Sequence, residues 1–314
     1  MEKITIVIPN YNGKKFLKDC LDSLREQTFK EFKIIMVDNA SEDGAYEFVK
    51  ANYPEVEIVR LKKNYGFSVA VNVGIKKSTS EYVLLLNNDV RCDRDFVSEL
   101  YKCINKSPKI FAAASKMIQM YHPELLDSAG DDYTLFGWAV NRGVGRSVDT
   151  ANSSTDVFSA CAGAAIYRRE IFDEIGLFDV MHFAYLEDID VCYRARIYGY
   201  RVVYAPEAKV YHVGSGTSGS KYNSFKVKLA SRNNLYLNYK NMPIGQFIIN
   251  APWLIIGRIV KTLFFVFKGY GLDYIKGLAE GWETRHKCKK VKYEPEHFFN
   301  YCVIEWKLIL STLN

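Results

Sequence analysis

Near the start of the chain, three short apolar runs each end abruptly in asparagine or aspartate. They end at Pro9-Asn10-Tyr11-Asn12, at Val37-Asp38-Asn39 and at Leu86-Asn87-Asn88-Asp89. One such run usually marks only a strand that leads into a turn. Three in succession, each followed by a helical pattern, constrain the fold more strongly, because ligands of open α/β sheets bind at the carboxyl ends of the strands. The pattern predicts one site, for a nucleotide and a metal ion.

The first half of the chain alternates between strand-like and helix-like patterns. Strands are predicted at 4–8, 32–37, 56–61 and 82–86, and helices at 16–24, from Ser41, and at 68–77. This alternation predicts an α/β fold with a single, mostly parallel sheet flanked by helices. Residues 120–156 are rich in Gly, Asp, Ser and Tyr and are predicted to form loops, with regular structure resuming at 157–167.

The composition is that of an ordinary globular protein, with 48% apolar and 25% charged residues among 314. The net charge of +6 is too small to indicate a nucleic-acid partner, and we expect none. Seven cysteines without a C-x-x-C pair favour reduced, buried thiols in a cytoplasmic protein. Because a strand follows Met1 almost directly, we expect no signal peptide.

Residues 244–267 form the most apolar long segment, and the basic excess of the chain lies around and after it. Between Arg258 and Lys292, nine Lys or Arg oppose three acidic residues. Arg258, Lys261 and Lys268 share one helical face, which predicts an interfacial helix on an anionic membrane surface, with a basic patch at 287–292 beside it. The alternatives are a helix packed on the catalytic domain, a homodimer contact, or a transmembrane span.

Several enzyme classes are disfavoured by the residues that come after the first strand. Residues 9–13 contain no glycine-rich phosphate cradle, and the sequence has no Walker A motif, which argues against dinucleotide redox chemistry and ATP hydrolysis. The remaining possibility is a nucleotide held by amides, a carboxylate and an aromatic ring. Asp38 can accept a hydrogen bond from a base or ribose, and Tyr11 can stack on the base.

A second polar cluster lies at 185–194, where Glu187, Asp188 and Asp190 open an apolar-periodic helix. These carboxylates could simply favour the positive end of the helix dipole. The preceding residues, 175–184, are however aromatic and apolar, so a carboxylate that emerges from them is expected to be partly desolvated. Desolvation raises the pKa of a carboxylate toward the range useful for a general base.

His212 lies in a strand-like run at 210–213. A lone histidine is more often a core or surface residue than a ligand. Pairing with Asp89 would make it a candidate metal ligand.

The order and spacing of these motifs over residues 3–215 resemble glycosyltransferase family 2, and within it the rhamnosyltransferase-like members that build surface polysaccharides. The matching motifs are Val7 to Asn12, Val37 to Ser41, Asn64-Tyr65-Gly66-Phe67 with Asn72, Leu86 to Asp89, Glu187 to Asp190, and His212. The resemblance implies a type-A glycosyltransferase fold, with a catalytic domain at 1–225 and a helical, basic-apolar extension at 226–314. Within the catalytic domain, residues 1–119 would bind the nucleotide sugar and residues 120–225 the acceptor.

The resemblance also implies inverting transfer of a sugar from a nucleotide diphosphate, and it assigns roles to individual residues. Asp89 and His212 would hold a divalent cation, Mn²⁺ or Mg²⁺, although Asn87 replaces the first carboxylate of the family's Asp-x-Asp motif. Asp188 would be the general base, with Glu187 as a rival for this role. The nucleotide-sugar pocket would comprise Pro9, Tyr11, Asn12, Asp38, Asn39, Asn64, Gly66, Phe67, Asn72, Asn87, Asn88 and Gly163.

Three functions from different classes fit the sequence. The first is a glycosyltransferase that moves a sugar from dTDP-rhamnose or a UDP-sugar to a glycan or lipid-linked saccharide, as a cytoplasmic enzyme peripheral to the inner face of the cell membrane. The second is a nucleotidyltransferase, which would need a basic, glycine-rich triphosphate loop that 9–12 does not supply. The third is a catalytically weak or inactive sugar-nucleotide or glycan-binding subunit, an alternative that Asn87, in place of the motif's first carboxylate, leaves open.

Overall fold

The computed structural model describes residues 2–214 and 222–313. The strands of this part are β1 (Ile4–Asn10), β2 (Phe32–Asp38), β3 (Val56–Arg60), β4 (Tyr82–Leu86), β5 (Val90–Cys92), β6 (Ile110–Gln119), β7 (His122–Ser128), β8 (Asp131–Tyr133), β9 (Ala139–Asn141), β10 (Ala164–Arg168) and β11 (Arg201–His212). The α-helices are α1 (Lys14–Arg25), α2 (Ala45–Asn52), α3 (Phe67–Lys77), α4 (Phe96–Ile104), α5 (Ile171–Ile175), α6 (Glu187–Ile197), α7 (Ser224–Asn241), α8 (Ile244–Phe267), α9 (Gly271–Thr284) and α10 (Phe298–Leu313).

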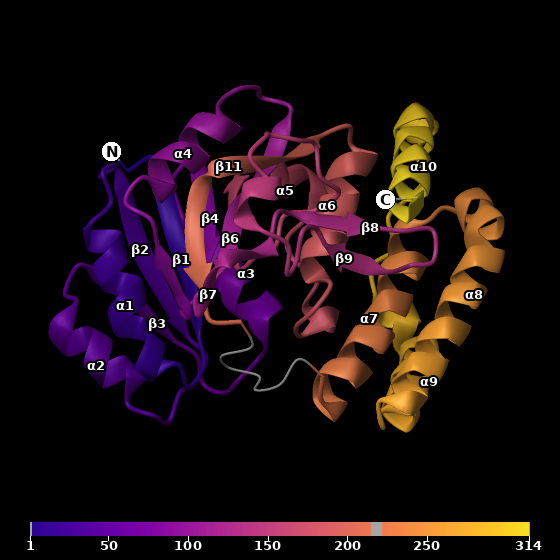
Figure 1. The fold of residues 1–314 in the computed structure, drawn as a ribbon, viewed down its shortest axis with the longest axis horizontal. Coiled ribbons are helices and arrows are strands. Elements are labelled where there is room, and N and C mark those ends of the chain that lie inside the picture. Colours follow the sequence, from indigo (N-terminus) through magenta and orange to yellow (C-terminus); the bar gives the residue numbers. More distant parts are fainter. Residues whose placement is uncertain (1, 215–221, 314) are drawn as a thin grey trace.

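A central sheet, with the strand order β3-β2-β1-β4-β10-β6-β11-β5, organises the described residues, and β7 pairs with β6 at its side (Figure 1). Strands β3, β2, β1 and β4 are parallel to one another. The side chains of β1, β2 and β4 are mostly buried on both faces, against α1, α2 and α4 on one face and α3, α5 and α6 on the other, whereas the edge strand β3 is partly exposed. Burial on both faces explains why these strands are continuous apolar runs in the sequence.

The second half of the sheet is mixed. Strand β10 is antiparallel to both β4 and β6, and β5 is antiparallel to β11, whereas β11 is parallel to β6. The α/β class and the strand ends of the first half are thus as predicted, but the sheet as a whole is not mostly parallel. The insertion of β10 beside β4 brings Gly163 against Asn87, whose backbone N–H donates to the Gly163 carbonyl at 2.7 Å.

The segment 120–156 is not the loop region that its composition predicts. It contains β7, which extends the central sheet, and the small antiparallel hairpin of β8 and β9. Short strands with many polar residues resemble loops in composition, and pairing with distant partners rather than local propensity decides their conformation. The β8–β9 hairpin projects toward the C-terminal helices (Figure 1).

The C-terminal helices gather at the end of the molecule opposite β3 (Figure 1). They share a third apolar core with the hairpin and α6, made of Tyr133, Phe158, Tyr193, Leu237, Leu254, Ile304 and their neighbours. A buried polar network also joins α6 to α7, because Asp190 accepts hydrogen bonds from Lys240 at 2.9 Å and from Asn241 at 2.8 Å. The extension is therefore packed into the body of the protein.

Candidate active site

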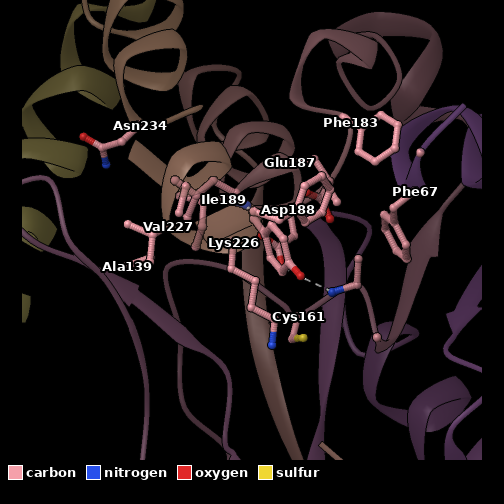
Figure 2. A pocket seen from close by; sticks show the side chains of 18 of the residues that line it. Phe67, Ala139, Cys161, Phe183, Glu187, Asp188, Ile189, Lys226, Val227 and Asn234 are labelled. Atoms are coloured by element: carbon pink, nitrogen blue, oxygen red, sulfur yellow. Dashed lines mark hydrogen bonds between the residues drawn. The ribbon is translucent and has the colours of Figure 1, made fainter. Parts of the chain in front are cut away.

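A cavity of about 1160 Å³ opens at the carboxyl ends of β1, β2 and β4 and reaches across to α7, α8 and the β8–β9 hairpin. It thus contains the sheet edge at which the sequence predicts a site. Figure 2 shows its central part, where Glu187, Asp188, Cys161 and Lys226 lie near one another.

Most of the residues predicted for the site line this cavity. They are Pro9, Tyr11, Asn39, Asn64, Gly66, Phe67, Asn87, Asn88, Asp89, Gly163, Glu187, Asp188 and His212. Asn39 and Asn64 are bonded to each other, with Nδ2 of Asn39 donating to Oδ1 of Asn64 at 3.0 Å. Gly66 must be glycine, because it has a φ of +88° and a Cβ there would lie 2.6 Å from the Phe183 ring and carbonyl.

Three predicted residues do not line the cavity. The amide of Asn72 exchanges two hydrogen bonds with the backbone of Phe178, and Asn12 accepts from the backbone N–H of Glu42. Asp38 is fully buried and accepts from Asn10. In the structure these polar groups are used to fix turns, a role that residue type and spacing could not distinguish from ligand binding.

Asn10 is a site residue that the sequence analysis did not select. Its Nδ2 donates to Asp38 at 3.1 Å, and its Oδ1 accepts from Nδ2 of Asn88 at 2.6 Å. Asn10 therefore joins the end of β1 to the ends of its two neighbouring strands, β2 and β4. Its position within a strand-end motif was the available signal. This chain of hydrogen bonds holds the three strand ends in one rigid edge.

Asp89 and His212 come together from distant parts of the chain. Nε2 of His212 lies 3.3 Å from Oδ1 of Asp89, and its Nδ1 lies 2.7 Å from Oδ2 of Asp127. Burial alone would lower the pKa of His212, but its hydrogen bonds to the two carboxylates outweigh burial and raise the pKa to about 9. Asp127 was missed because it lies in the segment predicted to be loop.

This arrangement fits a divalent cation. A carboxylate bonded to one ring nitrogen of a histidine fixes the tautomer in which the other nitrogen is free to bind a metal. Asp127 occupies that orienting position, so Nε2 of His212 and a carboxylate oxygen of Asp89 can ligate the same ion. Oxygen and imidazole ligands of this kind suit Mn²⁺.

The Glu187–Asp188 pair opens α6 at the middle of the cavity (Figure 2). Burial raises the pKa of both carboxyl groups, and the neighbouring charge of Asp188 raises that of Glu187 further. Backbone N–H groups of Ile189, at 2.8 Å, and Ala162, at 3.4 Å, donate to Asp188 and partly stabilise its ionised form. Oε2 of Glu187 is buried without a hydrogen-bond partner in the described structure, a state that favours a protonated Glu187.

Asp131 and Cys161 extend this carboxylate site, and neither was selected from the sequence. Asp131, Cys161 and Asp188 each place one carboxylate or thiol atom within 4.8 Å of the others. Burial and the charge of Asp188 raise the pKa of Asp131 well above its ordinary value. Two carboxylates this close in a buried site favour sharing one proton.

The loop before the carboxylate pair is strained. Phe183, Tyr185 and Leu186 have φ values of 61°, 74° and 65°, in the left-handed region that such side chains rarely adopt. The buried amide of Asn233, on α7, holds the loop, with its Nδ2 at 2.8 Å from the carbonyl oxygens of His182, Ala184 and Tyr185. The position of the carboxylates therefore depends on the C-terminal helices.

The structure corrects the direction of the basic face predicted for 244–267. Arg258 and Lys261 line the cavity, and neither is on the outer face of α8. Helical spacing showed that these residues lie together, but it could not show which way they point. Lys268, at the end of the helix, is exposed as predicted.

Comparison with known proteins identifies the family. The profile described as "Glycosyl transferase family 2" matches residues 5–176, more than half of the chain. The chain belongs to glycosyltransferase family 2. The match includes the ends of β1, β2 and β4, with Asp89, Asp131 and Gly163, and ends shortly before the Glu187–Asp188 pair.

Individual relatives in the family are distant. Glycosyltransferase GlyA of Streptococcus pneumoniae is 35% identical over 106 residues, which are 33% of this chain and 15% of that protein. N-acetylglucosaminyl-diphospho-decaprenol L-rhamnosyltransferase of Mycobacterium tuberculosis is 23% identical over 241 residues, covering 69% of this chain and 78% of that protein. The chain spans less than half of the length of the relatives that it matches first.

A solved structure extends the likeness to the C-terminal helices. The mannosyltransferase PcManGT of Pyrobaculum calidifontis, solved with GDP-Man and Mn²⁺, matches with a TM-score of 0.57 and 15% identity, over 98% of this chain and 80% of its own. The family 2 chain therefore has the type-A glycosyltransferase fold, with a helical C-terminal region as predicted.

Proposed function

We propose that this family 2 glycosyltransferase transfers a sugar with inversion from a nucleotide diphosphate, dTDP-rhamnose or a UDP-sugar, to a hydroxyl of a glycan or lipid-linked saccharide. The observation that carries the proposal is the convergence of two chemical sites on one cavity. Asp89 and His212 lie at the nucleotide edge, and Asp188 lies in the middle of the cavity wall. Residues 1–119 would hold the donor, and residues 120–225, extended by the helices of 226–314, would hold the acceptor.

In this mechanism Asp188 accepts the proton of the acceptor hydroxyl while the acceptor oxygen bonds to the anomeric carbon of the sugar. The bond between that carbon and the diphosphate breaks, and its electrons leave with the diphosphate. A divalent cation held by Asp89 and His212 would stabilise the negative charge on the leaving group. Asp188 is favoured over Glu187 because backbone N–H groups stabilise its charged form, whereas a buried oxygen of Glu187 lacks a partner in the described structure.

We further propose that the enzyme works at the inner face of the cell membrane, as a peripheral protein. Helix α8 is long and apolar enough to cross a bilayer, and only 17% of its most apolar stretch is buried. However, Arg258 and Lys261 face the same cavity as the carboxylates, so α8 cannot cross the bilayer without carrying that cavity into it. A peripheral contact explains both the low burial of α8 and the position of its two cations in the cavity. The contact with an anionic lipid surface would use the outer face of α8 and the exposed Lys287, Lys289 and Lys290.

The outer face of α8 is apolar along its length. Ile249 is 65% exposed, Leu263 is 55% exposed and Phe267 is 88% exposed. Monomeric proteins rarely expose a contiguous apolar surface of this kind without a binding role. Flotation on anionic vesicles tests the membrane proposal, and a protein that stays in solution as a dimer would refute it.

The donor proposal is tested by a melting-temperature screen of dTDP-rhamnose and UDP-sugars with Mn²⁺ or Mg²⁺, followed by a hydrolysis assay of each stabilising compound. A ligand that binds only the folded state raises the melting temperature. We expect one nucleotide sugar to stabilise the protein and to be hydrolysed slowly when water replaces the acceptor. Stabilisation without hydrolysis, even with added saccharide acceptors, would indicate a binding subunit, and no stabilisation by any nucleotide sugar would refute the proposal.

A further inference from the structure

The cavity wall opposite the nucleotide edge carries two cations that the proposed transfer reaction does not use. Arg258 and Lys261 are one turn apart on α8 and both line the cavity. Within residues 2–214 and 222–313, Nε and Nη2 of Arg258 are buried and have no hydrogen-bond partner. Such groups are costly to bury unless an oppositely charged ligand compensates them.

The described surroundings of this cation pair, Arg258 and Lys261, supply no counter-charge. The charged or titratable groups that act on Arg258 are the phenols of Tyr133 and Tyr274, which are neutral at ordinary pH because burial raises the pKa of both. Burial alone lowers the pKa of Lys261 to about 8, without a compensating carboxylate. The nearest described partner of its ammonium group is the Trp138 ring, whose centroid is 5.7 Å away.

The position of the cation pair is fixed by close packing. A Cβ on Gly257 would lie 2.2 Å from the Phe136 carbonyl oxygen, so only glycine allows α8 to approach the β8–β9 hairpin. Nε1 of Trp138 donates to the Gly257 carbonyl at 3.2 Å and holds the two elements together. A rigid, uncompensated pair of cations in a cavity is suited to a phosphate group.

The opposite face of the same helix is suited to a lipid. Ile255, Ile259 and Leu263 are each 54–55% exposed, and their spacing of four residues places them in one row along α8. A molecule with a phosphate inside the cavity and an apolar chain along α8 would satisfy both faces.

We infer that Arg258 and Lys261 bind the phosphate of an acceptor saccharide that is carried on a lipid phosphate or diphosphate. This inference rests on the proposed glycosyl transfer and specifies its acceptor. The saccharide, attached to that phosphate, would extend from α8 toward Asp188, which lines the same cavity. The donor diphosphate is assigned to the opposite edge, at Asp89 and His212.

The probe for this site is farnesyl diphosphate, compared with inorganic pyrophosphate and farnesol. Binding is measured by calorimetry in excess EDTA, so that no metal at Asp89 captures the diphosphate. We compare the wild type, the double variant Arg258→Gln/Lys261→Gln, and Lys268→Gln as a control that removes an exposed charge from the same helix. A hydrogen-bonded charge pair contributes enough to binding that its loss should weaken farnesyl diphosphate roughly 10- to 100-fold in the double variant, with no change in the control.

Several outcomes would overturn the inference. If farnesyl diphosphate bound equally well to the wild type and the double variant, Arg258 and Lys261 would not be part of its binding site. Pyrophosphate binding as tight as that of farnesyl diphosphate would show a site for a free anion, and farnesol binding as tight would show an apolar site without phosphate recognition. A matching loss of UDP affinity in the presence of Mn²⁺ would assign the pair to the donor.

Misfolding of the double variant is tested separately. Removing two half-buried charges that have no described counter-charge should leave the melting temperature unchanged or raise it. Slow hydrolysis of the nucleotide sugar without acceptor should also persist in the double variant. If the wild type hydrolyses no nucleotide sugar, the proposed transfer fails, whereas the phosphate site is still judged by the binding data.

Discussion

Replacing either of two aspartates in the first turn of α6 by asparagine should change stability in opposite directions. Asp188 lies in the cavity, and burial raises its pKa, so its charged form is unfavourable in the folded protein. Burial alone would raise the pKa of Asp190 as well, but the charges of Lys240 and Arg194 outweigh burial and hold that pKa well below its ordinary value. The same change of side chain thus relieves a cost at one position and removes a stabilising charge at the other.

The structure sets the size of each effect. Without Asp190, Lys240 still has Asp179 at 2.8 Å, and Arg194 still donates to three backbone carbonyls, so the loss lies near the lower end for a broken buried ion pair, about 3 kcal/mol. The N–H groups of Ile189 and Ala162 donate to different oxygens of Asp188, so Asp188→Asn keeps the shorter bond, from Ile189, and loses the weak one at 3.4 Å; the net gain should be at most on the order of 1 kcal/mol. At about 2 °C per kcal/mol in a large domain, the two variants should melt up to roughly 8 °C apart.

The pH dependence follows from the sign of each pKa shift. Because folding raises the pKa of Asp188, Asp188→Asn gives its full gain in stability above the pKa that Asp188 has in the folded protein. The gain vanishes below the pKa of the same group in the unfolded chain, near 4. The depressed pKa of Asp190 means that its stabilisation is present above that unfolded value and is lost only as pH falls further, toward the folded pKa. At pH 5 the deficit of Asp190→Asn should therefore remain, while the gain of Asp188→Asn is reduced.

The assay is thermal melting by circular dichroism in EDTA at pH 7.5 and pH 5, combined with turnover measured as release of the nucleotide diphosphate. Asp188→Asn should lose roughly 10²- to 10⁴-fold in turnover, the usual contribution of a general base, while its melting temperature rises. If it melts as low as Asp190→Asn, the carboxylate of Asp188 stabilises the fold and the reasoning fails. Normal turnover of the Asp188→Asn variant would refute its role as the base.

Three further predictions concern other parts of the site. Asp89→Asn should lower turnover roughly 10²-fold or more by weakening charge stabilisation on the diphosphate, and full wild-type activity in excess EDTA would contradict a metal at Asp89. Burial and the charge of Asp188 raise the pKa of Asp131 well above its ordinary value, so Asp131 is protonated where Asp188 titrates, and Asp131→Asn should leave the acidic limb of the turnover profile in place; a limb that moves to lower pH would show that Asp131 is charged there. Asn233→Ala removes the hydrogen bonds that hold the strained loop before α6 and should lower turnover about tenfold or more. Asn238→Ala, on the same helix as Asn233, removes the acceptor of the buried Tyr133 hydroxyl and should lower only the melting temperature. Equal turnover in both variants would show that Asn233 does not position the carboxylates.

The gathering of the strand ends at one edge of the cavity could be predicted because its signals are local. Each strand is an apolar run, and the polar residues that reach the cavity come directly after it in the sequence, as at Asn39 and Asp89. Parallel pairing then brings these ends together by a general rule of α/β folds. The pairing of Asp89 with His212 could also be predicted from the sequence, because few residue types ligate metals.

The other side of the cavity could not be predicted in the same way. Asp127 and Asp131 lie in the short polar strands β7 and β8, so nothing local in the sequence distinguishes them from loop residues. Arg258 and Lys261 were found on one helical face, but the direction of that face depends on the β8–β9 hairpin that α8 packs against. The strain at Tyr185 and Leu186 has no sequence signature, since it is imposed by Asn233 from α7.

The hydrogen bonds from Asn233 to the loop before α6 limit how this protein can be re-engineered by exchanging segments with other proteins. A chimera that replaced the C-terminal helices with those of another glycosyltransferase would remove the amide that holds the carbonyls of His182, Ala184 and Tyr185. The carboxylates at the start of α6 would then lose their alignment even though no residue of α6 had changed. The unit of exchange must therefore include the loop before α6 together with α7, and acceptor preference cannot be transplanted with the outer helices alone.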